Sequence, residues 1–89
     1  ELHQNYPNPF NPITRINYDL PMSSKVKIHI HDMNGKKVST LLNEFKPPGY
    51  WHVFWDGKSE EGKAVSSGMY FYTIETKEFM KSKKMLLIK

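Results

Sequence analysis

The chain contains no cysteine and no long apolar segment among its 89 residues. Absence of cysteine rules out a disulfide framework and thiolate chemistry, so stability must come from the packing of aromatic and aliphatic side chains. A membrane-spanning helix needs about 18 or more apolar residues in a row, and no such run exists. The start, Glu1-Leu2-His3-Gln4, lacks the basic and apolar layout of a signal peptide. We expect one small domain cut from a longer chain, with the activity upstream.

Signatures of catalysis are absent as well. No serine, histidine and acid arrangement carries a nucleophile signature, and no glycine-rich phosphate loop appears. The only adjacent carboxylates, Glu60 and Glu61, stand in a polar segment between two glycines. The sequence therefore predicts a protein that is not an enzyme. A net charge of +4, from lysines that are scattered along the chain, does not indicate a nucleic-acid partner.

Two patterns resemble metal sites without completing one. His29 and His31 are two positions apart on a predicted strand, so both rings project from one face, as in some zinc and copper sites. A third ligand would have to come from His3 or His52, which only a suitable fold would bring close. Residues 56–62 resemble an acidic calcium loop, but a lysine stands where an oxygen ligand is needed. We interpret these patterns as exposed strand histidines and a polar turn, with no metal and no cofactor.

Three prolines occupy alternate or nearby positions in the segment Tyr6-Pro7-Asn8-Pro9-Phe10-Asn11-Pro12. Proline fixes φ and removes a backbone donor, so this segment can form neither a helix nor a central strand. The sequence predicts a proline-rich extended lead-in or linker over residues 1–12, followed by a folded domain over residues 13–89.

The rest of the chain alternates apolar and polar residues with the period of two that is typical of half-buried strands. The predicted strands cover residues 15–20, 25–31, 37–42, 50–55, 69–76 and about 79–88. Short strands at a spacing of about ten residues, without a long helix, favour an all-β fold. We predict an immunoglobulin-like antiparallel β-sandwich of about seven short strands. The order of the strands does not follow from their spacing.

Local signals place turns and irregularities between these strands. Asn34-Gly35 suits the positive φ of a primed hairpin turn after residue 31. Leu41-Leu42 breaks the alternation, which indicates a bulge or a strand end. A short helix over 39–45 is the alternative there, and Pro47-Pro48 would end it within two turns.

Aromatic residues allow two interpretations. They could form a platform for sugar rings, as in carbohydrate-binding modules, or they could fill the core. The core is favoured because a chain this small depends on aromatic side chains for most of its apolar area. We predict Trp51, Val53 and Trp55 in the core. The residues expected to point outward are Tyr50, Phe54 and Phe71.

Four blocks of the chain together resemble the C-terminal sorting domain of proteins exported by the bacterial type IX secretion system, also called the Por secretion system type A sorting domain. The opening block is Pro7, Asn8, Pro9, Phe10, Asn11 and Pro12. The second contains Asp32 and Gly35, and the third contains Gly49, Trp55, Asp56, Gly57, Gly62, Gly68 and Tyr70. The terminal block is Lys83, Lys84, Met85, Leu86, Leu87, Ile88 and Lys89. The third block alone also resembles the immunoglobulin-like domain of the flagellar hook-capping protein.

The resemblance implies a noncatalytic sorting signal on a secreted cargo protein. Such domains fold in the periplasm, are recognised by the type IX apparatus and cross the outer membrane to the cell surface or the medium. A sortase-like surface peptidase commonly removes them, and here the cut would fall upstream of Tyr6. We hypothesise that residues 83–89 are the recognised epitope, read by strand addition and by the charge of the two adjacent lysines, Lys83 and Lys84.

Two other interpretations stay open. The first is a small noncatalytic carbohydrate-binding or spacer module attached to a secreted enzyme or adhesin, and its mark would be a ring of exposed aromatic residues on one sheet face. The second is a purely structural sandwich like that of the hook-capping protein, which the proline-rich opening and the terminal block disfavour. An exposed edge strand would also permit weak self-association.

Overall fold

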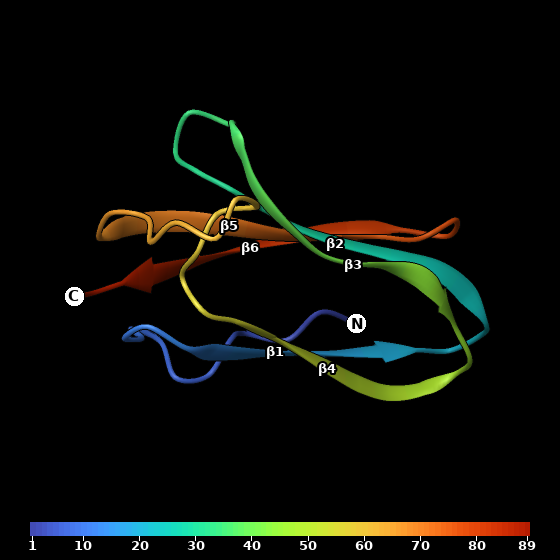
Figure 1. Ribbon diagram of the computed structural model, residues 1–89. Helices are drawn as coiled ribbons and strands as arrows, with labels where there is room; N and C mark the ends of the chain where they lie inside the picture. The colour runs from blue at the N-terminus through green and yellow to red at the C-terminus, as the bar shows by residue number, and fades with distance from the viewer.

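Two antiparallel β-sheets face each other in the computed structural model, which describes all residues 1–89 (Figure 1). The strands are β1 (Thr14–Leu20), β2 (Ser24–His31), β3 (Lys37–Lys46), β4 (Gly49–Trp55), β5 (Gly68–Glu75) and β6 (Met80–Leu87). One sheet pairs β1 with β4, and the other has the order β3-β2-β5-β6. The predicted immunoglobulin-like antiparallel sandwich is confirmed, with six strands in place of about seven. None of its elements is a helix that could cross a membrane.

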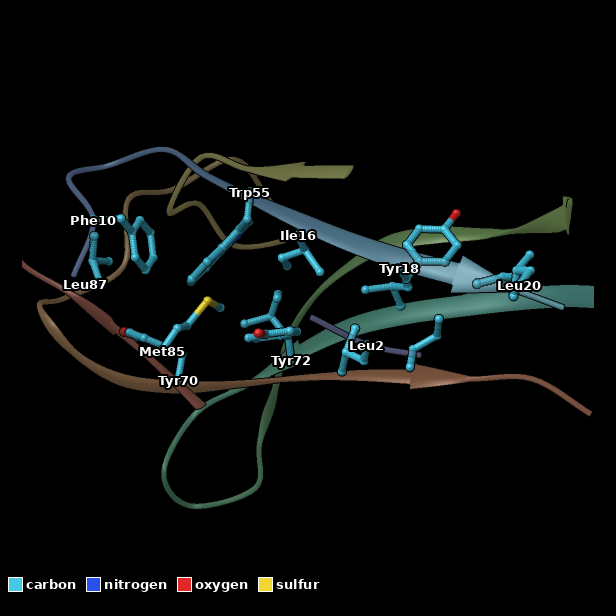
Figure 2. Packing of buried hydrophobic residues seen from close by; sticks show 14 residues of the cluster. Leu2, Phe10, Ile16, Tyr18, Leu20, Trp55, Tyr70, Tyr72, Met85 and Leu87 are labelled. Carbon is cyan, nitrogen blue, oxygen red and sulfur yellow. The ribbon is translucent and has the colours of Figure 1, made fainter. Parts of the chain in front are cut away.

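The period-two pattern places one face of each strand in a shared core. In β1 and β2 every second residue is buried, so that Ile16 and Ile28, for example, have no exposed surface. Burial of such side chains is the main favourable term in folding, at about 25 cal/mol per Å². Figure 2 shows the cluster between the sheets. Its members are Leu2, Phe10, Ile16, Tyr18, Leu20, Val26, Ile28, Ile30, Trp55, Tyr70, Tyr72, Ile74, Met85 and Leu87.

Strand β3 is longer than its sequence pattern indicated. It continues to Lys46 as a strand, so the alternative of a helix over 39–45 is wrong. Its register against β2 shifts where Ile28 pairs with Leu42 and His29 pairs with Thr40. Leu41 is the extra residue between these pairs, which confirms a bulge at the point where the alternation breaks.

The turn between β2 and β3 differs from the predicted primed turn. Gly35 has a φ of +82°, but no residue other than glycine has a positive φ, so Asn34 does not adopt the conformation that a primed turn requires. The carboxylate of Asp32 instead accepts hydrogen bonds from the backbone N–H groups of Asn34 and Lys36, each at 2.9 Å. Hydrogen bonds from the turn backbone to the Asp32 side chain thus stabilise this turn without a positive φ at Asn34.

The predicted β4 core is only partly confirmed. Trp55 is 1% exposed, whereas Trp51 and Val53 are half-buried because β4 is the open edge of a two-stranded sheet. The indole N–H of Trp51 donates to the carbonyl of Pro47 at 3.0 Å. On the opposite side of the strand, Tyr50 is 88% exposed as expected. Phe54 also points outward, and Phe71 is half-buried.

The proline-rich opening packs on the sandwich and does not behave as a free linker. Leu2 and Phe10 are 4% and 2% exposed and belong to the core. The hydroxyl of Tyr72 donates to the carbonyl of His3 at 2.7 Å and accepts the backbone N–H of Asn5 at 2.8 Å. The domain boundary at residue 12 stays a prediction, but the segment before it is part of the folded structure.

Two buried tyrosines make the stability of the fold sensitive to alkaline pH. Burial raises the pKa of Tyr18 to about 12, and the negative charge of Glu44 acts in the same direction. Burial also raises the pKa of Tyr72 to about 12. In the unfolded chain both hydroxyls ionise near pH 10. Between pH 10 and 12 the unfolded state therefore binds fewer protons than the folded state, and stability falls as pH rises.

We predict that Tyr18→Phe reduces this alkaline loss of stability. The Tyr18 hydroxyl is buried and has no hydrogen-bond partner, so its removal should leave stability at pH 7 unchanged or higher. The measurement is urea unfolding at pH values from 7 to about 11. Tyr50→Phe, which changes an exposed hydroxyl, is the control and should follow the parent chain. Equal alkaline losses in Tyr18→Phe and the parent chain would contradict the prediction.

Candidate recognition site at the carboxyl-terminal strand

Strand β6 is an edge strand, and its two faces have different environments. It pairs with β5 on one side only, in a register that places Met85 opposite Tyr70 and Leu87 opposite Gly68. The side chains of Met85 and Leu87 are 1% and 0% exposed, and Figure 2 shows them in the core beside Phe10. Half of the apolar residues in the predicted epitope thus serve the core and are not accessible to a partner.

The accessible part of the predicted epitope lies mainly on the outer face and at the end of the chain, although Lys83 shares the face of Met85. Lys84, Ile88 and Lys89 are exposed, and Lys83 and Leu86 are half-buried. The backbone N–H of Lys89 donates to the hydroxyl of Ser67 at 3.1 Å, and its side chain donates to the carbonyl of Val65. The last residue is therefore tied to the loop before β5, which orders the end of the chain.

The opening motif covers part of the outer edge of β6. The N–H of Phe10 donates to the carbonyl of Leu86, and the N–H of Ile88 donates to the carbonyl of Phe10, both at 3.0 Å. The side-chain carbonyl of Asn8 accepts the N–H of Leu86 at 3.0 Å. Two residues before Leu86, the carbonyl of Lys84 accepts a hydrogen bond from the side-chain amide of Gln4 at 2.9 Å. The two ends of the sequence thus form one short parallel pair.

Sequence reasoning missed this pairing. It identified the opening motif and the terminal block separately and assigned strand addition to the terminal block, although Leu86 and Ile88 already bond to the chain's own lead-in. The available signal is the proline spacing. Because Pro7 and Pro9 have no backbone N–H, the donors left in this stretch, on Asn8 and Phe10, are at alternate positions, which suits pairing along one edge.

Residues of the third motif block pack against the opening motif. The ring centroid of Phe10 lies 5.7 Å from that of Trp55, and the ring centroid of Tyr70 lies 5.3 Å from that of Trp55. The indole N–H of Trp55 donates to the carbonyl of Lys58 at 2.9 Å. Gly57 has a φ of +74°, and a Cβ there would lie 3.2 Å from the carbonyl oxygen of Pro12. A side chain at this position is therefore disfavoured by conformation and by space.

The remaining motif residues shape turns. Gly68 pairs with Leu87 at the end of β6. The hydroxyl of Tyr70 donates to the carbonyl of Ser66 at 2.7 Å, which fixes the loop that enters β5. The other members lie away from this pairing: Asp32 and Gly35 in the β2–β3 turn, Gly49 at the start of β4, and Asp56 and Gly62 in the loop after β4.

The histidines do not assemble into the site that their spacing suggested. The rings of His29 and His31 contact each other edge to face at 4.8 Å, without His3 or His52 in a common cluster. Burial, and then the charge of His31, lowers the pKa of His29. His3 instead lies beside Asp19, with 3.1 Å between Nε2 and the carboxylate, and Glu1 is 3.8 Å from its other ring nitrogen. These partly exposed contacts are one hydrogen bond, to Asp19, and one longer contact, to Glu1, at the surface.

We predict that Asn8→Ala loosens the end of β6. The substitution removes the acceptor of the Leu86 N–H, and a hydrogen bond of this kind contributes about 1 kcal/mol. Amide exchange at Leu86 should then become about fivefold faster, since 1.4 kcal/mol corresponds to a factor of ten. Asn11→Ala is the matched control, because the exposed Asn11 side chain makes no hydrogen bond. Unchanged exchange at Leu86 would show that Asn8 does not hold the strand.

Comparison with known proteins gives a match to one family model and matches to several solved structures, among them the following two. The model of the FlgD Ig-like domain family matches residues 13–78. PorZ of Porphyromonas gingivalis, described as an essential bacterial surface component of the type IX secretion system, superposes with a TM-score of 0.66 at 20% identity, over 97% of this chain and 11% of that one. The alkylpurine DNA glycosylase AlkC of Pseudomonas fluorescens superposes with a TM-score of 0.53 at 13% identity, over 100% of this chain and 30% of that one. No curated protein matches the chain.

Proposed function

The chain belongs to the FlgD Ig-like domain family, and we propose that it acts as a noncatalytic sorting domain that directs a cargo protein across the bacterial outer membrane through the type IX secretion system. The observation that carries the proposal is the pairing of the opening motif with the terminal strand. The opening block is the most specific part of the resemblance to sorting domains, and the terminal block matches their terminal signal. Their contact gives a physical reason for their presence in one chain.

The structural likeness to PorZ supports this proposal at the level of the fold. An immunoglobulin-like sandwich of this size occurs within a surface component of the same secretion system. The proposed location follows from the function: the periplasm in transit, and then the outer-membrane surface or the medium.

The proposed protein partners are the type IX apparatus and a sortase-like surface peptidase. The side chains available to the apparatus are Lys83, Lys84, Leu86, Ile88 and Lys89, whereas Met85 and Leu87 maintain the fold. A peptidase needs an extended and accessible chain. Leu2, Asn5 and Phe10 are buried, and Leu2, Tyr6 and Phe10 pair with β1 or β6, so among cuts upstream of Tyr6 one ahead of Leu2 fits the structure best.

The export test uses a reporter protein fused ahead of residues 1–89 in a bacterium that has the type IX system. We expect the reporter at the surface or in the medium, and we expect periplasmic retention in a strain that lacks the outer-membrane translocon. Lys83→Ala with Lys84→Ala should reduce export, because it removes the charges beside the terminal strand. Lys36→Ala with Lys37→Ala, at the β2–β3 turn, is the matched control. Retention of the folded parent fusion in both strains would refute the sorting role.

A second candidate function has one specific observation in its favour. Tyr50, His52 and Phe54 are exposed on the outer face of β4, with 88% exposure for Tyr50 and 57% for Phe54. On the same face, β1 presents polar side chains opposite them, since Arg15 pairs with Phe54 and Asp19 with Tyr50. Aromatic faces beside hydrogen-bonding groups suit a sugar ring. A carbohydrate-binding or spacer module would use this face.

The carbohydrate hypothesis predicts that Tyr50→Ala with Phe54→Ala weakens binding of the purified domain on a glycan array. A loss of about tenfold or more in affinity corresponds to at least 1.4 kcal/mol from the two rings. Phe45→Ala is the control, because Phe45 is 66% exposed on β3, in the other sheet. No binding of the parent domain to any glycan would remove this candidate.

A further inference from the structure

The lead-in leaves one section of the β6 edge open. In an antiparallel pair, every second residue of the edge strand directs its N–H and C=O groups away from its neighbour. The bonds of Leu86 and Ile88 to the lead-in place the even-numbered residues of β6 in this orientation. The carbonyl of Lys84 is taken by Gln4. The N–H of Lys84 and both backbone groups of Ser82 face outward beyond the last strand of the sheet, and no protein group bonds to them.

This open section carries only positive charge. Lysines occupy positions 81, 83 and 84, and no acidic residue occurs from Phe79 to Lys89. Lys81 and Lys83 lie on one face of the strand and Lys84 lies on the other, because side chains alternate along a strand. The acidic groups nearest in sequence are Glu75, at the end of β5, and Glu78, in the turn before β6. An added strand would therefore have ammonium groups on both of its sides.

We propose that the edge from Met80 to Lys84 binds an extended acidic segment of a partner protein by strand addition. The inference rests on the proposed sorting function, in which the partner belongs to the export apparatus. Main-chain hydrogen bonds to Ser82 and Lys84 would supply affinity, and the lysines would select acidic side chains. Met80, which is 67% exposed, offers an apolar contact at the start of the edge.

The same charges exclude a second copy of this chain as the occupant. Two copies that paired through this edge would bring lysines directly opposite lysines, and like charges across a strand pair are destabilising. Lysine on an edge strand also prevents aggregation between edges. Pairing of this edge with the same edge of a second copy is therefore disfavoured, whereas pairing with a negatively charged strand is favoured.

The test titrates the isotope-labelled domain with a short peptide of alternating Glu and Val, and a peptide of alternating Lys and Val serves as the charge control. Amide exchange at Ser82 and Lys84 should slow by about tenfold with the acidic peptide and stay unchanged with the basic one. Ser82→Pro removes an outward N–H and should weaken binding by about tenfold or more, since proline is tolerated in an edge strand but cannot donate. Ser82→Ala loses the same side-chain bond to Thr73 and should bind like the parent chain.

Three outcomes would overturn the proposal. They are slowed amide exchange at residues other than Ser82 and Lys84, equal binding of the basic and acidic peptides, and dimerisation of the domain through residues 80–84. Binding of the acidic peptide by Ser82→Pro as tightly as by the parent chain would also overturn the proposal, provided that thermal unfolding shows both Ser82 variants to be folded. The export assay separates the two proposals. Normal export of the Ser82→Pro fusion would refute the docking edge alone, whereas failure of the parent fusion would refute the sorting function and leave the peptide result standing.

Discussion

Backbone pairing between Phe10 and the segment from Leu86 to Ile88 is the constraint on which the rest of the structure depends. It joins the two ends of a chain that has no disulfide to do so. The pairing also places the Phe10 ring against Trp55. These two rings lie at one end of the core between the sheets (Figure 2). A small domain buries little surface, so the apolar area that the lead-in adds is a large part of its stability.

Pairing with the lead-in also closes one of the open edges of the sandwich. The lead-in covers the end of β6, and the loop after β4 covers part of β3, where the N–H of Glu60 donates to the carbonyl of Val38 and its carboxylate accepts the N–H of Thr40. Open edges invite unwanted pairing, and folded proteins usually cover or charge them. This molecule uses both devices on β6. The lead-in covers residues 86–88, and lysines charge the neighbouring section, residues 80–84.

Local patterns in the sequence predicted the strands but not the contacts between distant segments. The alternation around Ile16 and Ile28 is visible because each strand has one buried face. The burial of Met85 follows the same rule, yet the resemblance to a sorting signal led to an epitope of consecutive residues. The partial exposure of Trp51 depends on the two-stranded sheet in which it lies, and the bond from Asn8 to Leu86 spans nearly the whole chain, so neither has a local signature.

The structure also explains why shortening the chain is a poor way to find a sorting signal in it. The terminal strand supplies Met85 and Leu87 to the core and holds the lead-in through Leu86. Removal of these residues would open a cavity and release Phe10, at a cost of several kcal/mol in a domain of marginal stability. Loss of export after such a truncation would report unfolding as readily as lost recognition. Substitutions at Lys83 and Lys84, whose side chains lie outside the core cluster, should change the surface and leave the fold in place.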